Sequence, residues 1–189
     1  MRALSFVSML LAAGCPALDV GQPIVLEPGD DWTPNEVETV RTAAECWNLQ
    51  FGTRLVMPGE VGWSQHVDLG FSDFVCAFAL AQTNPTLPVS VEICPPGHYF
   101  GWSEKHSQRL LFETVLHELG HVLNIRRHAD DPLAVMASGK VKKDLSQLVP
   151  ARFAAEDRQL FHEANGELGQ ACEVVVNREN IPPSCSCAP

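Results

Sequence analysis

The segment from Ser103 to about Leu123 constrains the fold more than any other part of this chain of 189 residues. Its apolar side chains recur at helical spacing, which predicts a helix with one buried face: Leu111, Val115, Leu119 and Val122. His117 and His121 lie four residues apart in the same segment. On a helix they occupy one face, one turn apart, so both imidazoles can reach a single metal ion.

Glu118 directly follows the first of these histidines. Its carboxylate can point at a water molecule on the metal and take a proton from it as general base while the water attacks a carbonyl. Zinc lowers the pKa of such a water to about 7, so hydroxide is available at neutral pH. The pattern His-Glu-x-x-His fixes only three positions and also occurs by chance in long helices. The predicted helix, an export signal and the segment downstream all favour a metal site.

The segment downstream extends the pattern. Together with the helix it resembles the metzincin zinc metallopeptidases, and their matrixin-like branch in particular. That family reads His-Glu-x-x-His-x-x-Gly-x-x-His, followed by a turn that carries a methionine beneath the zinc. His117, Glu118 and His121 match directly, and the spacing from His128 to Met136 is similar. The resemblance implies one zinc ion held by the three histidines, with Glu118 as the base and Met136 as a hydrophobic floor.

Two departures from the family pattern follow the second histidine. Asn124 replaces the glycine that lets the chain leave the helix in a left-handed conformation, and asparagine is the best substitute for glycine there. His128 comes one residue late, with Arg127 in the family's histidine position. Arg127 has no lone pair to offer a metal, so the turn must bulge for His128 to become the third ligand. The alternative is that His128 is a surface histidine.

Other residues remain open as third ligands. In the gluzincin families a glutamate from a later helix fills this position, and a helix is expected here from about Ala151 to Ala164. Glu156 or Asp157 could take that role, and Asp130 and Asp131 are more distant options. In matrixin-like chains an aspartate after the methionine turn supports the lower half of the domain. That resemblance implies a structural role for Asp157.

The N-terminus predicts export. A short positive start precedes an apolar stretch, Ala3 to Ala13, that is too short to span a bilayer but typical of a signal peptide. It ends in a sequence that resembles a bacterial lipobox, so we expect removal of residues 1–14 and lipidation of Cys15. The alternative is cleavage near Ala17. The protein is therefore expected in the bacterial cell envelope, anchored by lipid to the outer membrane, or in the medium.

Besides Cys15, the chain has six cysteines: Cys46, Cys76, Cys94, Cys172, Cys185 and Cys187. An even number in an oxidising compartment predicts three disulfides, for which 15 connectivities are possible. A cysteine-bound metal is disfavoured because Cys185 and Cys187 are too close together for the usual zinc spacing.

The remaining elements predict a mixed α/β, or α+β, domain. Thr33, Pro34 and Glu36 start a helix that Gly52 ends. Apolar segments predict strands at 24–26, 55–57, 67–71 and 89–93, and Val174 to Val176 is apolar too. The segment from Cys76 to Pro88 has no clear assignment. The expected fold is a metzincin-like single catalytic domain: a small twisted sheet, a zinc-binding helix and a C-terminal helix.

The sequence also predicts the domain organisation and the kinds of partner that the protein binds. Residues 32–165 form the expected catalytic domain, after a tether (15–31) and before a disulfide-bearing tail (166–189). A hydrophobic fraction of 46% excludes a disordered chain. A net charge of −10 argues against a nucleic-acid partner. We expect a monomer that acts on proteins or peptides and contacts membrane only through its lipid.

The predicted function is that of an exported zinc-dependent endopeptidase. Two alternatives stay open from the sequence. One is a non-catalytic envelope protein that contains zinc, although such a site needs no base and closes its fourth position with a protein ligand. The other is a zinc hydrolase that acts on cell-wall amides.

Overall fold

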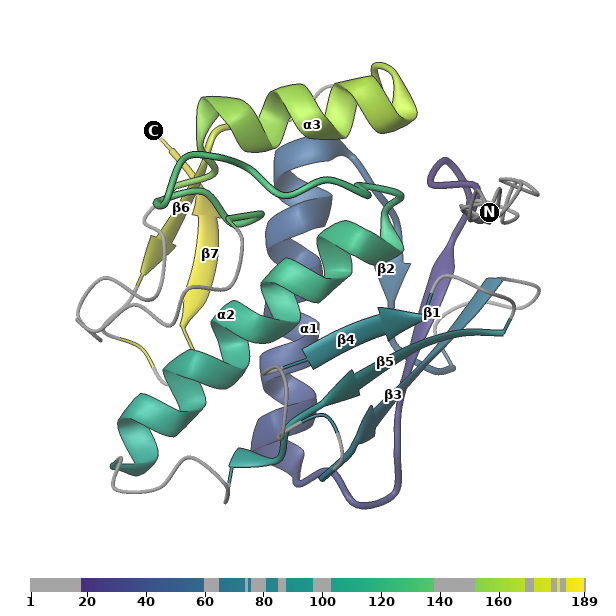
Figure 1. Ribbon diagram of the computed structural model, residues 1–189, viewed down its shortest axis with the longest axis vertical. Coiled ribbons are helices and arrows are strands. Elements are labelled where there is room, and N and C mark those ends of the chain that lie inside the picture. Colours follow the sequence, from purple (N-terminus) through teal and green to yellow (C-terminus); the bar gives the residue numbers. More distant parts are fainter. Residues whose placement is uncertain are drawn as a thin grey trace, which may run out of the picture.

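The computed structural model describes residues 18–59, 65–73, 75, 81–84, 88–96, 103–137, 152–168, 172–177, 180 and 183–188. Within these ranges it contains three helices, a five-stranded mixed sheet and a separate two-stranded sheet (Figure 1). The mixed α/β character expected from the sequence is confirmed. Of the helices in the described ranges, none is both long and apolar enough to cross a membrane.

The larger sheet has the strand order β2-β1-β3-β5-β4. Its strands are β1 (Ile24–Pro28), β2 (Leu55–Val56), β3 (Gln65–Phe71), β4 (Ala81–Asn84) and β5 (Val89–Ile93). β1, β2, β3 and β5 run parallel, and β4 pairs antiparallel with β5 at one edge. Four of these strands were predicted. β4 was not, because its segment has none of the alternating apolar residues that indicate a strand.

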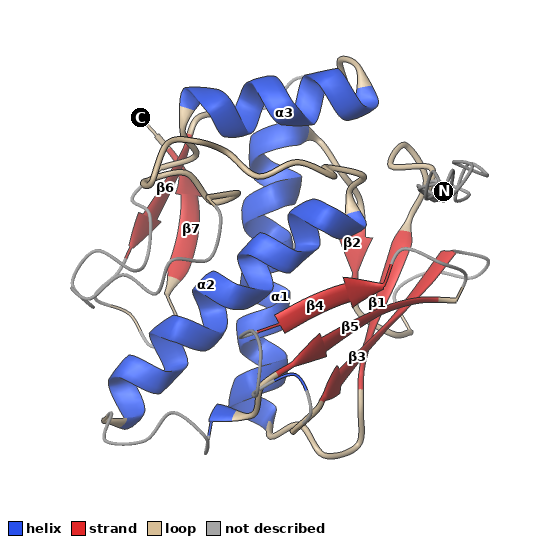
Figure 2. Ribbon diagram, in the orientation of Figure 1, coloured by secondary structure: helices blue, strands red, loops and turns tan. Residues whose placement is uncertain are grey.

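One face of this sheet is covered by helices (Figure 2). In β3 and β5, buried Val67, Leu69 and Val91 alternate with exposed residues such as Asp68 and Glu92. Successive side chains of a strand point to opposite faces, so the apolar set lies on the helix side. The pattern that predicted these strands also gives their orientation.

Helix α1 (Pro34–Phe51) begins and ends where the sequence indicated. Thr33 and Glu36 form a reciprocal capping box, and Gly52 closes the helix in the left-handed conformation with φ 68°. Near its end, Trp47 is fully buried and donates its indole N–H to the carbonyl of Leu116, 2.8 Å away. This bond fixes α1 against the helix that carries the histidines.

Helix α2 (Glu104–Val122) is the histidine helix, and α3 (Ala155–Asn165) lies across the end of α1 (Figure 1). Phe161 of α3 stacks on Phe51 of α1, with ring centroids 4.2 Å apart. The expected start of α3 near Ala151 was too early. Residues 152–154 stay out of the helix because Phe153 packs on Trp47 and the side chain of Asp157 accepts the backbone N–H of Ala154.

The C-terminal region contains a hairpin of β6 (Val174–Asn177) and β7 (Ser184–Cys187) that packs against α1. Two disulfides hold it: Cys46–Cys185 joins β7 to α1, and Cys172–Cys187 closes its base. Cys94 is also disulfide-bonded. Disulfide formation by the cysteines is therefore confirmed in part, while Cys76 and Cys15 lie outside the described residues.

Candidate metal centre

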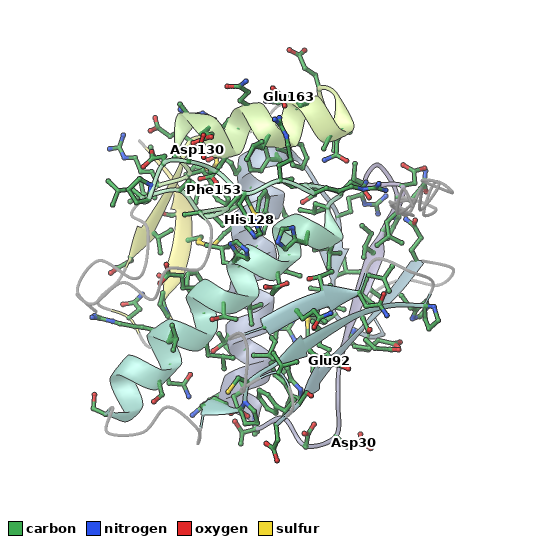
Figure 3. All side chains as sticks on the ribbon, in the orientation of Figure 1. Asp30, Glu92, His128, Asp130, Phe153 and Glu163 are labelled. Atoms are coloured by element: carbon green, nitrogen blue, oxygen red, sulfur yellow. A yellow bond between two sulfur atoms is a disulfide. The ribbon has the colours of Figure 1, made fainter. Side chains whose placement is uncertain are left out.

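Three histidines come together at the C-terminal part of α2 and the loop after it. The one from the loop, His128, is labelled in Figure 3. The ring centroids of His117 and His121 are 4.9 Å apart. The ring centroid of His128 lies 5.2 Å from that of His117 and 5.1 Å from that of His121. One ring nitrogen from each falls within 4.8 Å of the others. This set could hold a metal ion, and it is the set predicted from the sequence.

Backbone carbonyls orient the two helix histidines. Nδ1 of His117 donates to the carbonyl of Val135 at 2.7 Å, and Nδ1 of His121 donates to the carbonyl of Ile125 at 2.6 Å. A carbonyl only accepts, so Nδ1 carries the hydrogen and Nε2 is left with its lone pair. Bonds of this kind fix the ring and tautomer of a metal-binding histidine.

Desolvation favours the neutral, metal-binding form of His117 and His128. Desolvation lowers the pKa of His117 to about 4, with smaller contributions from its two histidine neighbours against the raising effect of the Val135 carbonyl. The pKa of His128 is also lowered, first by desolvation and then by His121. A metal ligand must be neutral imidazole, so little proton competition is expected from His117 at neutral pH.

Glu118 is buried, with 6% of its surface exposed, although its neighbour His117 is only half-buried. Its Oε2 accepts a hydrogen bond of 2.5 Å from the hydroxyl of Thr83 on β4. Burial raises the pKa of the Glu118 carboxyl above its ordinary value, and the bond from Thr83 opposes that shift. A carboxylate that is desolvated and held in this way is typical of a general base.

The extra residue before His128 is taken up in an exposed turn. Asn124 adopts φ 67°, and the N–H of Ile125 bonds to the carbonyl of Gly120 at 3.0 Å, which ends the helix. Arg127 then points outward and pairs with Glu163 of α3. The bulge therefore places an arginine on the surface and returns His128 to the other two histidines.

Asn124 does more than tolerate the left-handed conformation. Its side-chain amide donates to the carbonyl of Leu18 at 2.9 Å and to the side chain of Asn165 at 3.1 Å. Asn165 in turn donates to the carbonyl of Leu123 at 2.8 Å. The side chain that replaces glycine thus joins the end of α2 to the N-terminal segment and to α3.

Of the four carboxylates considered as alternative ligands, Glu156 and Asp157 bind backbone amides of the loop. Glu156 accepts the N–H groups of Asp130 and Asp131 at 3.0 and 2.8 Å. Asp157 is fully buried and accepts the N–H groups of Val135 and Met136, both at 2.9 Å. These bonds shape the loop that carries His128.

Met136 lies beneath the histidine helix and is fully buried. Its Sδ occupies the space where a Cβ on Gly120 would lie, and Trp47 borders the same space. Position 120 therefore needs a glycine because the side chains of Met136 and Trp47 approach its backbone closely, and not because of its conformational freedom. The role of Met136 as a hydrophobic floor stays a prediction from the resemblance.

The sequence analysis missed Thr83 and assigned Glu156 only a possible role as a metal ligand. Thr83 lies in the segment without an assignment, and no local signal linked it to Glu118, which is 35 residues further along the chain. Glu156 was considered only as a ligand, although its role in the structure is to bind the loop. Cys15, the expected lipidation site, lies outside the described residues.

No protein-family model matches the chain, and a search of curated proteins finds no similar sequence. The resemblance to metzincins therefore depends on the motif residues and their spacing alone.

Proposed function

We propose that this chain is a zinc-dependent endopeptidase. The observation that carries the proposal is the combination of three convergent histidines with a buried carboxylate on the same helix. Imidazole suits zinc well, and catalytic zinc sites often have three protein ligands and one open position. Among the described residues, no fourth histidine, cysteine, aspartate or glutamate joins the three histidines.

Each residue has a distinct task in this proposal. When bound, zinc would act as a Lewis acid toward the scissile carbonyl and would lower the pKa of a water molecule to about 7. His117 and His121 offer Nε2 because their Nδ1 atoms are engaged, and His128 closes the set from the loop. Glu118 accepts the proton of the attacking water and passes it to the leaving amine.

The buried base favours catalysis over a purely structural metal site. A structural zinc site has four protein ligands and no use for a desolvated carboxylate beside it. The acyl group attacked could belong to a protein or to a cell-wall amide, since the zinc chemistry is the same for both. We propose proteins as substrates because the motif and the spacing from His128 to Met136 resemble those of endopeptidases.

The test uses the full chain, produced with its disulfides formed, and its Glu118→Gln variant. We expect one zinc ion per chain in both, hydrolysis of an unfolded protein by the wild type, and a loss of about 100-fold or more in the variant. Full zinc with no hydrolysis of unfolded protein would refute the endopeptidase. Cleavage of cell-wall amides instead would establish the alternative substrate class.

The third ligand has its own test. His128→Ala should lower zinc affinity strongly, whereas His162→Ala, a change in an exposed histidine on α3, should leave it unchanged. Equal zinc affinity in His128→Ala and the wild type would remove His128 from the site.

We also propose an exported protein that is anchored through a lipid on Cys15. The disulfides on the described part of the chain are consistent with an oxidising compartment. Incorporation of labelled fatty acid by the wild type, and its absence in Cys15→Ser, would support the anchor. Equal labelling would refute it.

A further inference from the structure

The contact between β4 and the buried carboxylate of α2 points to a role for a residue outside the metal centre. Thr83 lies on the edge strand β4, opposite Val91 of β5. Along β4, half-buried Ala81 and Thr83 alternate with exposed Gln82 and Asn84. The side chain of Thr83 therefore faces α2, where its Oγ1 lies 2.5 Å from Oε2 of Glu118.

We propose that Thr83 is a positioning residue that orients the carboxylate of Glu118 toward the reacting water. This inference rests on the proposed function, because it assigns Glu118 its role as base. The proposed role of Thr83 is exerted through Glu118 alone.

The geometry makes the interaction directional. The hydroxyl of Thr83 has one hydrogen, and its two acceptors on Glu118 lie at 2.5 Å (Oε2) and 3.4 Å (the main-chain carbonyl oxygen). The hydrogen therefore goes to Oε2, since bonds from hydroxyl to carboxylate are typically 2.5–2.7 Å long. With Oε2 engaged, Oε1 is the carboxylate oxygen of Glu118 to which no described residue donates a hydrogen bond.

Such a constraint matters for a general base on a flexible side chain. Glutamate has three side-chain torsions, and a base works only within hydrogen-bond reach of the proton that it removes. Among the described residues, Thr83 is the one side chain for which a hydrogen bond to this carboxylate is recorded. The donor lies on β4, which pairs with β5, so its position is fixed by the sheet as well as by the contact of β4 with α2.

The test compares Thr83→Val, which removes the hydroxyl at nearly equal volume, with Thr83→Ser, which retains it. Thr42→Val is a matched control, since its hydroxyl donates only to the carbonyl of Glu38 within α1. We expect Thr83→Val to bind zinc normally and to lower kcat by roughly 10- to 100-fold, with KM within about twofold, as expected from a misplaced catalytic group. Thr83→Ser should recover most of kcat, and Thr42→Val should retain it.

A second measurement needs no activity. In the metal-free protein, Thr83→Val should lower the midpoint of urea unfolding, and it should lower it less when Glu118 has already been changed to Ala. This non-additivity is the signature of a direct interaction between the two side chains.

The outcomes separate this inference from the proposed function. An unchanged kcat in Thr83→Val, or equal unfolding shifts in the presence and absence of the Glu118 carboxylate, would overturn the role of Thr83 while the wild type remains an active enzyme. A fall in kcat that Thr83→Ser does not recover would also overturn it. A wild type that is loaded with zinc yet inactive would overturn the proposed function, and the inference with it.

Discussion

The metal centre has two halves that are held in different ways: the helix half, His117 and His121, and the loop half, His128. His117 and His121 stand on a regular helix, and their spacing alone brings them together. His128 stands on an irregular loop, and its place depends on carboxylates of α3 that bind the loop's backbone. The helix half is thus fixed by local geometry, whereas the loop half is fixed by residues more than twenty positions further along the chain.

This difference predicts unequal sensitivity to mutation. Substitutions on α3 should disturb the loop half directly, and they should reach the helix half only through Val135, whose carbonyl accepts the hydrogen bond from His117. Changes beneath α2 should disturb both, because the Nδ1 of His117 donates to Val135 in the loop. The predictions that follow use this contrast.

The largest effect is expected from Asp157→Ala. Asp157 accepts three backbone N–H groups, from Ala154, Val135 and Met136, and the substitution leaves them without that partner. Each buried backbone N–H that is left without a partner typically costs about 1–3 kcal/mol of unfolding free energy. Urea unfolding of the metal-free protein measures this loss, and zinc titration should show weaker binding.

Glu156→Ala is the matched control, because Glu156 is only half-buried and accepts two N–H groups from a more exposed part of the loop. Glu156→Ala should therefore lower the unfolding free energy clearly less than Asp157→Ala does. If Asp157→Ala were no more destabilising than Glu156→Ala, the loop would not depend on its buried carboxylate as the comparison requires.

Acid should lower the unfolding free energy of the metal-free protein, because His117 of the helix half takes up a proton more readily in the unfolded chain. Unfolding returns the pKa of His117 from about 4 to 6.5, so between these values the unfolded chain binds a proton that the folded one does not. Stability is therefore intact above pH 6.5 and falls as the pH drops, by at most about 1.4 kcal/mol per pH unit from this group. Between pH 6.5 and pH 4, the loss of unfolding free energy from this group adds up to about 3 kcal/mol.

Unfolding curves of the wild type and His117→Gln at several pH values isolate this contribution. Glutamine does not titrate, so the variant should lose less stability between pH 6.5 and pH 4. His128→Gln should change the pH dependence less, because His128 is exposed. Parallel pH profiles for the wild type and His117→Gln would contradict the assignment of this effect to His117.

The same contrast explains what the sequence could predict. The capping box of α1, the stripe on α2 and the pair of histidines are local patterns, and all of them were recognised. Strand β4 was missed because its inward side chains, Ala81 and Thr83, are small or polar and lack an apolar signal. Small or polar side chains are sufficient on β4 because it lies at the edge of the sheet and packs against a helix.

Long-range pairings were beyond the sequence for a physical reason. Whether Glu156 or Asp157 binds a metal or backbone amides depends on where α3 meets the loop, and helical spacing does not specify that meeting. The pairing of Cys46 with Cys185 likewise depends on β7 packing against α1. The resemblance to a family supplied the expectation for Asp157 that the residues alone left open.

Gly120→Ala should disturb both halves at once. A methyl group on Gly120 would overlap Sδ of Met136 and crowd Trp47, so the methionine and the loop must shift. Overpacking of this kind costs about 1–3 kcal/mol, partly offset by the better helix propensity of alanine. Thermal unfolding and zinc affinity should both decrease.

Gly70→Ala in β3 is the control, because a Cβ there meets no atom within 4 Å. It should leave zinc affinity unchanged. Equal zinc affinity in Gly120→Ala and the wild type would show that Met136 can move without disturbing the histidines.

The smallest effect is expected at Asn124, where the helix half passes into the loop half. Asn124→Gly keeps the left-handed backbone but loses the side-chain bonds to Leu18 and Asn165, at a cost of about 1 kcal/mol. Asn124→Ala loses the same bonds and adds about 1–2 kcal/mol for a left-handed alanine. If alanine were no worse than glycine in urea unfolding, the conformation at residue 124 would not be under strain. Zinc affinity should stay close to that of the wild type in Asn124→Gly, because the backbone path to His128 is preserved and the α3 carboxylates still hold the loop.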